Sequence, residues 1–380
     1  MTKRIVVTTG LALFAMFFGA GNIVFPLVLG AREGTHIGYA MVAFLIAAVG
    51  VPFLGLFATS LYKGDYWEFF GRLGKVPALL LSLFLIAVTG PLFSIPRTET
   101  VSYHSLLAFL PPGLNNPVIF SLLYCSILFL LTYNQGKVID IIGKYLSPVK
   151  LGTFIILILA GLLHTEAPLV NSEPLSSSII NGFVGGYGTM DLIGTFFYCT
   201  IIYRHLQTKM AAIGISSHRI TIKLFLHSCI VGAIVLSFVY IGFMVIALNH
   251  ASSLQGVDAA GIISAISKAI LGNSGSFFVG LCVLLACITT ATALTEVTTG
   301  FLYEHVVVKK IPRFCCLLAT LSLIFMMSLL DFGGIMRLAL PILEVLYPAL
   351  IVYCILNIVL MAGWFQKDTT SEEVEALGFK

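Results

Sequence analysis

The stretch FFGAGNIVFP, Phe17 to Pro26, interrupts the first apolar segment of the chain, which runs from about Ile5 to Gly30. Glycine, asparagine and proline weaken a helix, and a broken helix in hydrocarbon leaves backbone N–H and C=O groups without partners. Irregular backbone at that depth is tolerated only where it is buried in protein or lines a cavity. The stretch therefore predicts a broken helix whose main chain meets a ligand.

An alternative is that the glycines only let neighbouring helices pack closely, as small residues often do in membranes. Packing glycines favour four-residue spacing, whereas Gly19 and Gly21 are two residues apart. That role also does not require Asn22 and Pro26 beside them. The ligand-binding interpretation is the better one.

The composition places the whole chain in a membrane. Of its 380 residues, 58% are hydrophobic and 10% are charged, whereas a soluble domain has roughly a quarter charged residues. The mean hydropathy is +1.03. The formal net charge of +4 is small and dispersed, so no nucleic-acid partner is indicated. The 8 cysteines lie in apolar runs and predict packing residues, with neither a disulfide framework nor a metal site.

Hydrophobic run lengths predict an all-α integral membrane protein with about ten transmembrane helices. Helices are expected because they satisfy every backbone group in lipid, and the alternation typical of membrane β-strands is absent. The expected spans are 5–30, 36–61, 77–108, 117–134, 138–163, 186–203, 220–249, 274–305, 311–330 and 334–364.

The polar segment 164–185 divides a single transporter domain, 1–380, into two halves. The first half, 5–163, and the second, 186–364, hold five expected spans each, so the second runs in the opposite sense. Two inverted five-helix repeats are typical of secondary transporters. The segment 164–185 is then the extracytoplasmic connection, and residues 365–380 are expected to be a cytoplasmic tail.

Charge sets the expected orientation. Lysine and arginine gather at the N-terminus, in the loops after spans two, four, six and eight, and at the C-terminus, while the opposite loops hold only Arg32, Lys268 and Arg337. Cytoplasmic loops carry the excess of basic residues. Both termini are therefore expected in the cytoplasm, and the lipid bilayer is the expected surrounding.

The two halves share one local pattern. Span one contains GAGNIVF (19–25) and span six contains GTMDLIG (188–194), so that Gly19 matches Gly188 and Asn22 matches the near-isosteric Asp191. Interrupted helices at corresponding positions of inverted repeats form substrate sites near the bilayer midplane. The first and sixth helices are therefore both expected to be broken around a shared site.

Several longer stretches resemble the bacterial branched-chain amino acid carriers. They are FAMFFGAGNIVFPLVLG (14–30), IPRTETVSY (95–103), GYGTMDLIGTFF (186–197), ACITTATALTE (286–296) and LPILEVLYPALIVYCIL (340–356). The resemblance covers nearly the whole chain and implies a LeuT-like architecture. It implies a symporter in the bacterial inner membrane that imports leucine, isoleucine and valine with sodium, with no cofactor besides this ion. Family members often extend beyond ten spans, and the oligomeric state stays open.

The resemblance also implies a sodium site between spans one and eight. Its pattern is a carbonyl-donating alanine, two spacers and two adjacent hydroxyl residues, here Ala286, Thr289 and Thr290. The carbonyls of Ala15 and Phe18 complete the expected set, and all-oxygen ligation suits a hard cation. A threonine in a membrane helix can instead bond the carbonyl one turn before it.

For the substrate, the resemblance implies a carboxylate on the amides of span one and an ammonium on nearby carbonyls. The carboxylate is expected at Ala20, Gly21 and Asn22. The ammonium is expected at the carbonyls of Phe17 and of Tyr187, Gly188 and Thr189. With Asp191 as the one charge near these breaks, a neutral zwitterion with an apolar side chain fits best.

Ionisable residues deep in a membrane helix cost about 2.5–3.5 kcal/mol each unless paired or hydrated. Asp191 is therefore expected to couple transport or to hold the break in span six as a hydrogen-bond acceptor. Arg97 is expected to pair with Asp191 or with Glu296.

Two other functions remain open for this chain. A proton-coupled carrier of neutral amino acids would not need Thr289 and Thr290, and an amino-acid sensor of the same fold would not transport. An enzyme is not indicated, because the sequence has no HExxH, no GxSxG and no carboxylate pair at catalytic spacing.

Overall fold

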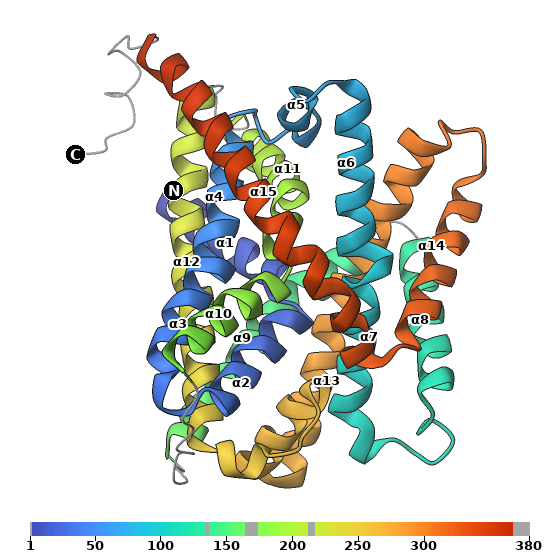
Figure 1. Cartoon of the computed structure of the whole chain (residues 1–380). Coiled ribbons are helices and arrows are strands. Elements are labelled where there is room, and N and C mark those ends of the chain that lie inside the picture. Colours follow the sequence, from blue (N-terminus) through green and yellow to red (C-terminus); the bar gives the residue numbers. More distant parts are fainter. Residues whose placement is uncertain (1, 134–136, 164–173, 212–216, 368–380) are drawn as a thin grey trace.

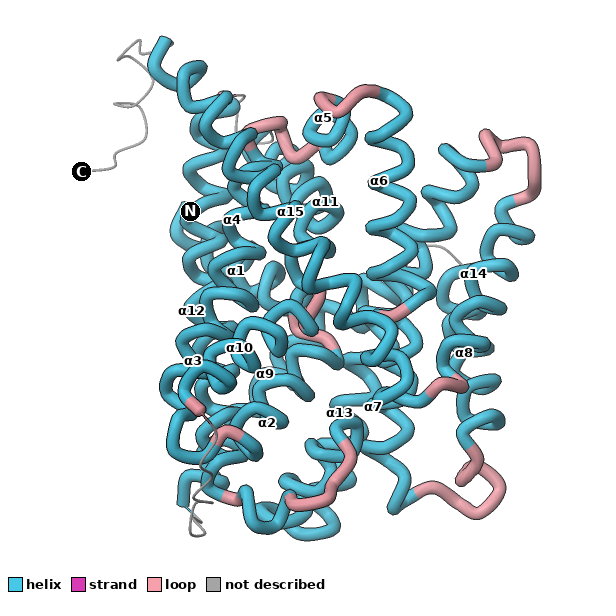
Figure 2. The backbone as a smooth tube through the Cα atoms, viewed as in Figure 1, coloured by secondary structure: helices cyan, strands magenta, loops and turns pink. Residues whose placement is uncertain are grey.

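The computed structural model describes residues 2–133, 137–163, 174–211 and 217–367. Within these ranges every regular element is a helix, and the helices form one bundle with most loops at its two ends (Figure 1). Figure 2 shows the exceptions as short loop segments midway along the bundle. The all-helical fold predicted from hydropathy is thus confirmed.

Span one is two helices joined at a sharp angle. Helix α1 (Thr2–Phe17) and helix α2 (Ala20–Arg32) are bent by 75°. The break falls on Phe18 and Gly19, inside the stretch that predicted it. Asn22 accepts the Gly19 N–H through its side-chain oxygen at 3.2 Å, so it satisfies one backbone donor that the break leaves free.

Spans two and three are also irregular, which the sequence analysis did not predict. In span three, Gly90 has non-helical torsion angles (φ −98°, ψ −114°) one residue before Pro91. Span two comprises η1 (Gly34–His36), α3 (Ile37–Leu45), the π-helical turn η2 (Ile46–Gly50) and α4 (Val51–Ser60). After α5 (Tyr66–Gly71), span three comprises α6 (Lys75–Ala87), η3 (Val88–Leu92), α7 (Ser94–Leu106) and η4 (Leu107–Phe109).

Span six begins earlier than predicted. Helix α10 (Leu175–Gly188) is followed by Thr189, Met190 and helix α11 (Asp191–Ala211). The break between them agrees with the prediction, but residues 175–185 are helix and not connection. The rest of that connection, 164–173, lies outside the described residues.

Helix α10 was missed because its serines and glycines lower its hydropathy, although they are what let it pack. A Cβ at Gly182 would lie 2.4 Å from the Ala40 carbonyl oxygen, and one at Gly186 would lie 2.4 Å from Ala47 Cβ. The small residues of α10 therefore bring its backbone directly against span two. Run length alone does not detect a helix that is buried in this way.

The remaining spans follow the predicted order. They are α8 (Pro117–Tyr133), α9 (Lys137–Leu163), α12 (His218–Asn249), α13 (Ile262–Phe301, continued by η7, Leu302–Val306), α14 (Arg313–Ser328) and α15 (Asp331–Lys367), with η5 (Ala251–Leu254) and η6 (Ala259–Gly261) before α13. Gly272, with φ +69°, separates a short first part of α13 from the long span. Of the predicted tail, residues 368–380 lie outside the described residues.

The helices are long and apolar enough for a membrane. Among the described segments, 5 could cross one by length and composition, or 6 if the bent pair α1–α2 counts as one span. Helices α8 and α14 are shorter and apolar. Large apolar side chains also face outward, such as Val345, which is 75% exposed. This outer surface is what a lipid-facing bundle requires.

Helix packing repeats between the two halves. Helices α1 and α2 of span one pack on α12, which is span seven, and α10 and α11 of span six pack on α3 and α4, which are span two. Each first span thus contacts the second span of the other half. Helices α7 and α13, the third spans, pack on each other. This exchange is the contact pattern of an inverted repeat.

Candidate substrate and ion site

The two broken helices meet through Asn22 and Asp191, the residues that occupy matching positions in the two halves of the sequence. Asn22 donates from Nδ2 to Asp191 Oδ2 at 2.5 Å, and both side chains are buried. Tyr240 of α12 donates to the same carboxylate oxygen at 3.2 Å and also contacts Asn22. Asp191 stands at the N-terminus of α11, where the helix dipole favours a negative charge. Asn22 and Asp191 therefore join the breaks of the two repeats.

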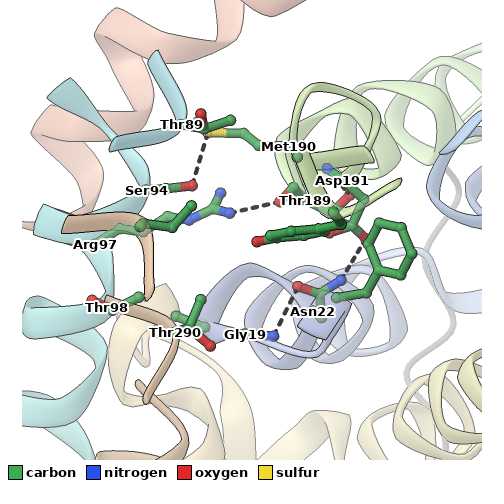
Figure 3. A pocket seen from close by; sticks show the side chains of 15 residues that line it. Gly19, Asn22, Thr89, Ser94, Arg97, Thr98, Thr189, Met190, Asp191 and Thr290 are labelled. Carbon is green, nitrogen blue, oxygen red and sulfur yellow. Dashed lines mark hydrogen bonds between the residues drawn. The ribbon is translucent and has the colours of Figure 1, made fainter. Parts of the chain in front are cut away.

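A small pocket lies beside this pair (Figure 3). Its volume is about 30 Å³, which is room for about two waters and far too little for an amino acid such as leucine. A substrate can enter only if side chains or half-helices move. The residues that line it are Phe17, Gly19, Ala20, Asn22, Thr89, Ser94, Arg97, Thr98, Thr189, Met190, Asp191, Gly194, Tyr198, Thr290 and Leu294.

Four of the predicted substrate residues line this pocket, and three lie just outside it. Gly21 is covered by the Arg97 side chain, and Gly188 is covered by the ring of Phe25. Tyr187 packs on Tyr347, with ring centroids 4.5 Å apart. The four predicted substrate residues that line the pocket are Phe17, Ala20, Asn22 and Thr189.

Arg97 does not form either ion pair expected for it. Its guanidinium donates to the backbone carbonyls of Thr189, at 2.6 Å, and of Gly188. Glu296 pairs instead with Arg313 of α14. Glu296 lies six residues after Thr290 on α13, about 9 Å farther along the helix, so it is remote from the pocket. Arg97 and Asp191 both line the pocket, but their charged atoms do not form an ion pair.

The expected sodium ligands are only partly assembled. The hydroxyls of Thr289 and Thr290 both donate to the Ala286 carbonyl, at 2.8 and 3.2 Å. Thr290 lines the pocket, whereas Thr289, Ala286 and Ala15 do not. This is the back-bonded geometry that the sequence analysis left open.

A lysine that the sequence analysis missed contacts the remaining expected ligand. Lys150 of α9 donates from Nζ to the Phe18 carbonyl at 3.0 Å, and its ammonium lies 5.5 Å from the centre of the Phe18 ring. The residue is 3% exposed. The position of Lys150 within the apolar span 138–163 was the available signal, because a charge at that depth needs a function or a partner. Tyr198 and Tyr240 gave no such signal.

The arrangement of broken helices defines the class of protein. A solved structure of Mhp1 in its inward-facing conformation is similar with a TM-score of 0.68 at 15% identity, over 94% of this chain and 77% of that one. The protein therefore has the LeuT-type fold of inverted repeats.

The sequence comparisons then give the family. The family model of branched-chain amino acid transport proteins matches residues 2–375, and the chain belongs to this family. The branched-chain amino acid permease BrnQ of Salmonella typhimurium is 28% identical over 373 residues, covering 97% of this chain and 83% of the relative. The permease BraB of Bacillus subtilis is 29% identical over 359 residues, covering 92% and 79%. The relatives are transport permeases, and this chain is a transporter and not an enzyme.

Proposed function

We propose that this chain imports leucine, isoleucine and valine across the bacterial inner membrane by alternating access, coupled to a cation. The observation that carries the proposal is the small pocket at the two helix breaks, which is lined by the buried and oppositely charged side chains of Asp191 and Arg97. Buried charges and broken backbone at membrane depth mark substrate pathways. Family membership supports branched-chain amino acids as the substrate class.

The chemistry of the pocket fits such a substrate. One negative and one positive side chain match the two charges of a zwitterion, and no further charged residue lines the pocket among the described residues. Phe17, Tyr198 and Leu294 supply apolar surface for an aliphatic side chain.

The proposed orientation with both termini in the cytoplasm is supported by Figure 1, where α5, the basic connection from α13 to α14 and the end of α15 lie at one end of the bundle.

Sodium is the coupled ion predicted from the sequence. In this version Thr290 and Thr289 would turn their hydroxyls from the Ala286 carbonyl to the ion, next to the carbonyls of Ala15 and Phe18. Oxygen donors of this kind suit sodium. One sodium ion per neutral substrate moves one charge inward, and a potential of 100 mV then contributes about 2.3 kcal/mol. That energy supports accumulation on the order of 50-fold.

A proton is the second candidate, and the position of Lys150 favours it. Its ammonium already occupies the Phe18 carbonyl, which is one of the expected sodium ligands. Among the residues whose side chains the structure describes, no carboxylate forms an ion pair with Lys150. A lysine without an acidic partner can take up and release a proton when its surroundings change between conformations. In this proton-coupled version, the positive charge that moves with the substrate is the proton carried by Lys150.

Leucine uptake into proteoliposomes tests both the function and the ion. Purified protein is reconstituted with an inside-negative potential, and uptake is measured with an inward sodium gradient, with an inward proton gradient in sodium-free buffer, and with neither. The sodium version predicts that Thr290→Ala raises the sodium concentration for half-maximal uptake. Thr292→Ala is its control, because Thr292 makes the same kind of hydroxyl bond, to the Ile288 carbonyl at 2.7 Å, outside the pocket.

The outcomes are distinct. Uptake that follows sodium and is weakened by Thr290→Ala supports sodium coupling, and uptake that follows the proton gradient without sodium supports Lys150. Leucine binding without any uptake under either gradient contradicts transport and favours a sensor. No binding and no uptake of leucine, isoleucine or valine contradicts the proposed substrate class.

A further inference from the structure

Arg97 holds a positive charge inside the pocket without an acidic partner. The residue is 4% exposed, and among the described residues no carboxylate forms an ion pair with it. Two of its nitrogens bond the Gly188 and Thr189 carbonyls, and its Nε has no hydrogen-bond partner. Burying a cation without full pairing costs free energy, so an anionic ligand that pairs with Arg97 would stabilise the protein.

The position of the guanidinium points to where that anion sits. A Cβ at Gly21 would lie 2.6 Å from Nη2 of Arg97 and 2.8 Å from its Cζ, so the guanidinium rests directly on the start of α2. That helix start offers backbone amides at Ala20 and Gly21, and the helix dipole there favours negative charge. Guanidinium and helix terminus therefore converge on one small volume, which borders the pocket (Figure 3).

A carboxylate is the ligand that fits both groups. Arginine binds a carboxylate with two parallel N–H···O bonds, which gives orientation as well as affinity. If the guanidinium turns toward a carboxylate, the Gly188 and Thr189 carbonyls at the end of α10 lose their cation. The ammonium of an α-amino acid, two bonds away from its carboxylate, supplies another. The two carbonyls and the guanidinium then each keep an oppositely charged or polar partner.

We propose that Arg97 is a substrate ligand that exchanges partners: its guanidinium moves from the Gly188 and Thr189 carbonyls to the carboxylate of the entering amino acid, whose ammonium takes over these carbonyls. This inference rests on the proposed function. Under this inference Arg97 binds the substrate carboxylate, which an Arg97 paired with Asp191 or Glu296 would not do. The exchange of partners also makes the Arg97 guanidinium one of the groups that move when a substrate enters the pocket of about 30 Å³.

The experiment compares two ligands that differ in the carboxylate. Leucine and 3-methylbutylamine, which is leucine without its carboxyl group, are titrated by calorimetry into the purified full-length protein. In the wild type, leucine binds far more tightly than the amine. Arg97→Gln is expected to weaken leucine binding at least about 30-fold, the usual effect of truncating one partner of a buried charge pair. It should change amine binding less than about threefold.

A purely structural role for Arg97 predicts a different result. If Arg97 only ties α7 to the end of α10, Arg97→Gln weakens both ligands equally and the leucine-to-amine ratio stays at its wild-type value, which overturns the inference. Arg337→Gln is the matched control, because Arg337 is exposed on α15 and both ligands should bind it as they bind the wild type.

Two further measurements keep the test decisive. Thermal unfolding of each variant shows whether it is folded, and if Arg97→Gln is not, Arg97→Lys replaces it. Lysine keeps the charge but loses the two-bond geometry, so the ratio should fall by an intermediate amount, and an unchanged ratio overturns the inference. A wild-type protein that binds no leucine contradicts the proposed function itself, whereas wild-type binding with an unaltered ratio in the variants contradicts only the role of Arg97.

Discussion

Replacement of Gly21 by alanine tests whether the contact between α2 and Arg97 matters for transport. The added Cβ would lie 2.6 Å from Nη2 of Arg97, whereas non-bonded atoms are comfortable at about 3.5 Å. The guanidinium therefore has to move by about 1 Å. Its hydrogen bond to the Thr189 carbonyl, 2.6 Å long, does not tolerate a displacement of that size in an unfavourable direction.

The size of the effect follows from the hydrogen bond that the displaced guanidinium would otherwise make to the substrate carboxylate. A bond made by a charged group contributes about 1.5–3 kcal/mol, and each 1.36 kcal/mol is a factor of ten. We expect Gly21→Ala to lower kcat/KM for leucine uptake by about 10- to 150-fold. Gly21→Leu, with a much larger side chain, should abolish uptake while leaving membrane insertion intact.

The assay is leucine uptake by reconstituted protein at a fixed inside-negative potential, normalised to the amount of inserted protein. Gly38→Ala is the control, because a Cβ at Gly38 of α3 meets nothing within 4 Å. Alanine is also the better helix former there, by about 0.5–1 kcal/mol. Gly21→Ala with wild-type kcat/KM would show that the guanidinium shifts at no cost and would refute the reasoning.

Two further predictions concern coupling and topology. Lys150→Gln, which removes the ammonium from the Phe18 carbonyl, should abolish the response of leucine uptake to a proton gradient while leucine exchange persists. The control Lys268→Gln, at an exposed lysine, should change neither uptake nor exchange. An undiminished proton response in Lys150→Gln excludes Lys150 as the coupling group. In a variant without the native cysteines, Ser176→Cys should react with an impermeant thiol reagent from outside, and Lys309→Cys should react only from the cytoplasm. Both positions are exposed, and they are predicted to lie on opposite sides of the membrane. The reverse labelling would show that the proposed topology is inverted.

The glycine-rich break was predictable because its cause is local. Gly19 and Asn22 lie within one turn of each other, and their effect on a helix in hydrocarbon does not depend on the rest of the chain. The match of Asn22 with Asp191 likewise follows from the repeat, and the structure adds that the two side chains bond to each other. Apolar run lengths gave most spans for the same local reason.

The partners of the buried charges depended on packing instead. Arg97 was expected to bond a carboxylate, yet it bonds carbonyls about 90 positions later in the chain, and Glu296 bonds Arg313 of the next helix. Lys150 and Phe18 are 132 residues apart. Which faces of two helices meet is set by side-chain shape along their whole contact, and hydropathy does not encode that.

Sequence alone therefore determined the membrane class, most of the spans, the break in each half and the family resemblance. Each of these depends on apolar length, on backbone propensity or on motifs that are contiguous in the chain. Only the tertiary structure placed Lys150 on the Phe18 carbonyl, Arg97 over Gly21 and α10 against span two. A buried cation takes whichever oxygen the assembled helices bring within about 3 Å, and that distance is decided by the packing of the entire bundle.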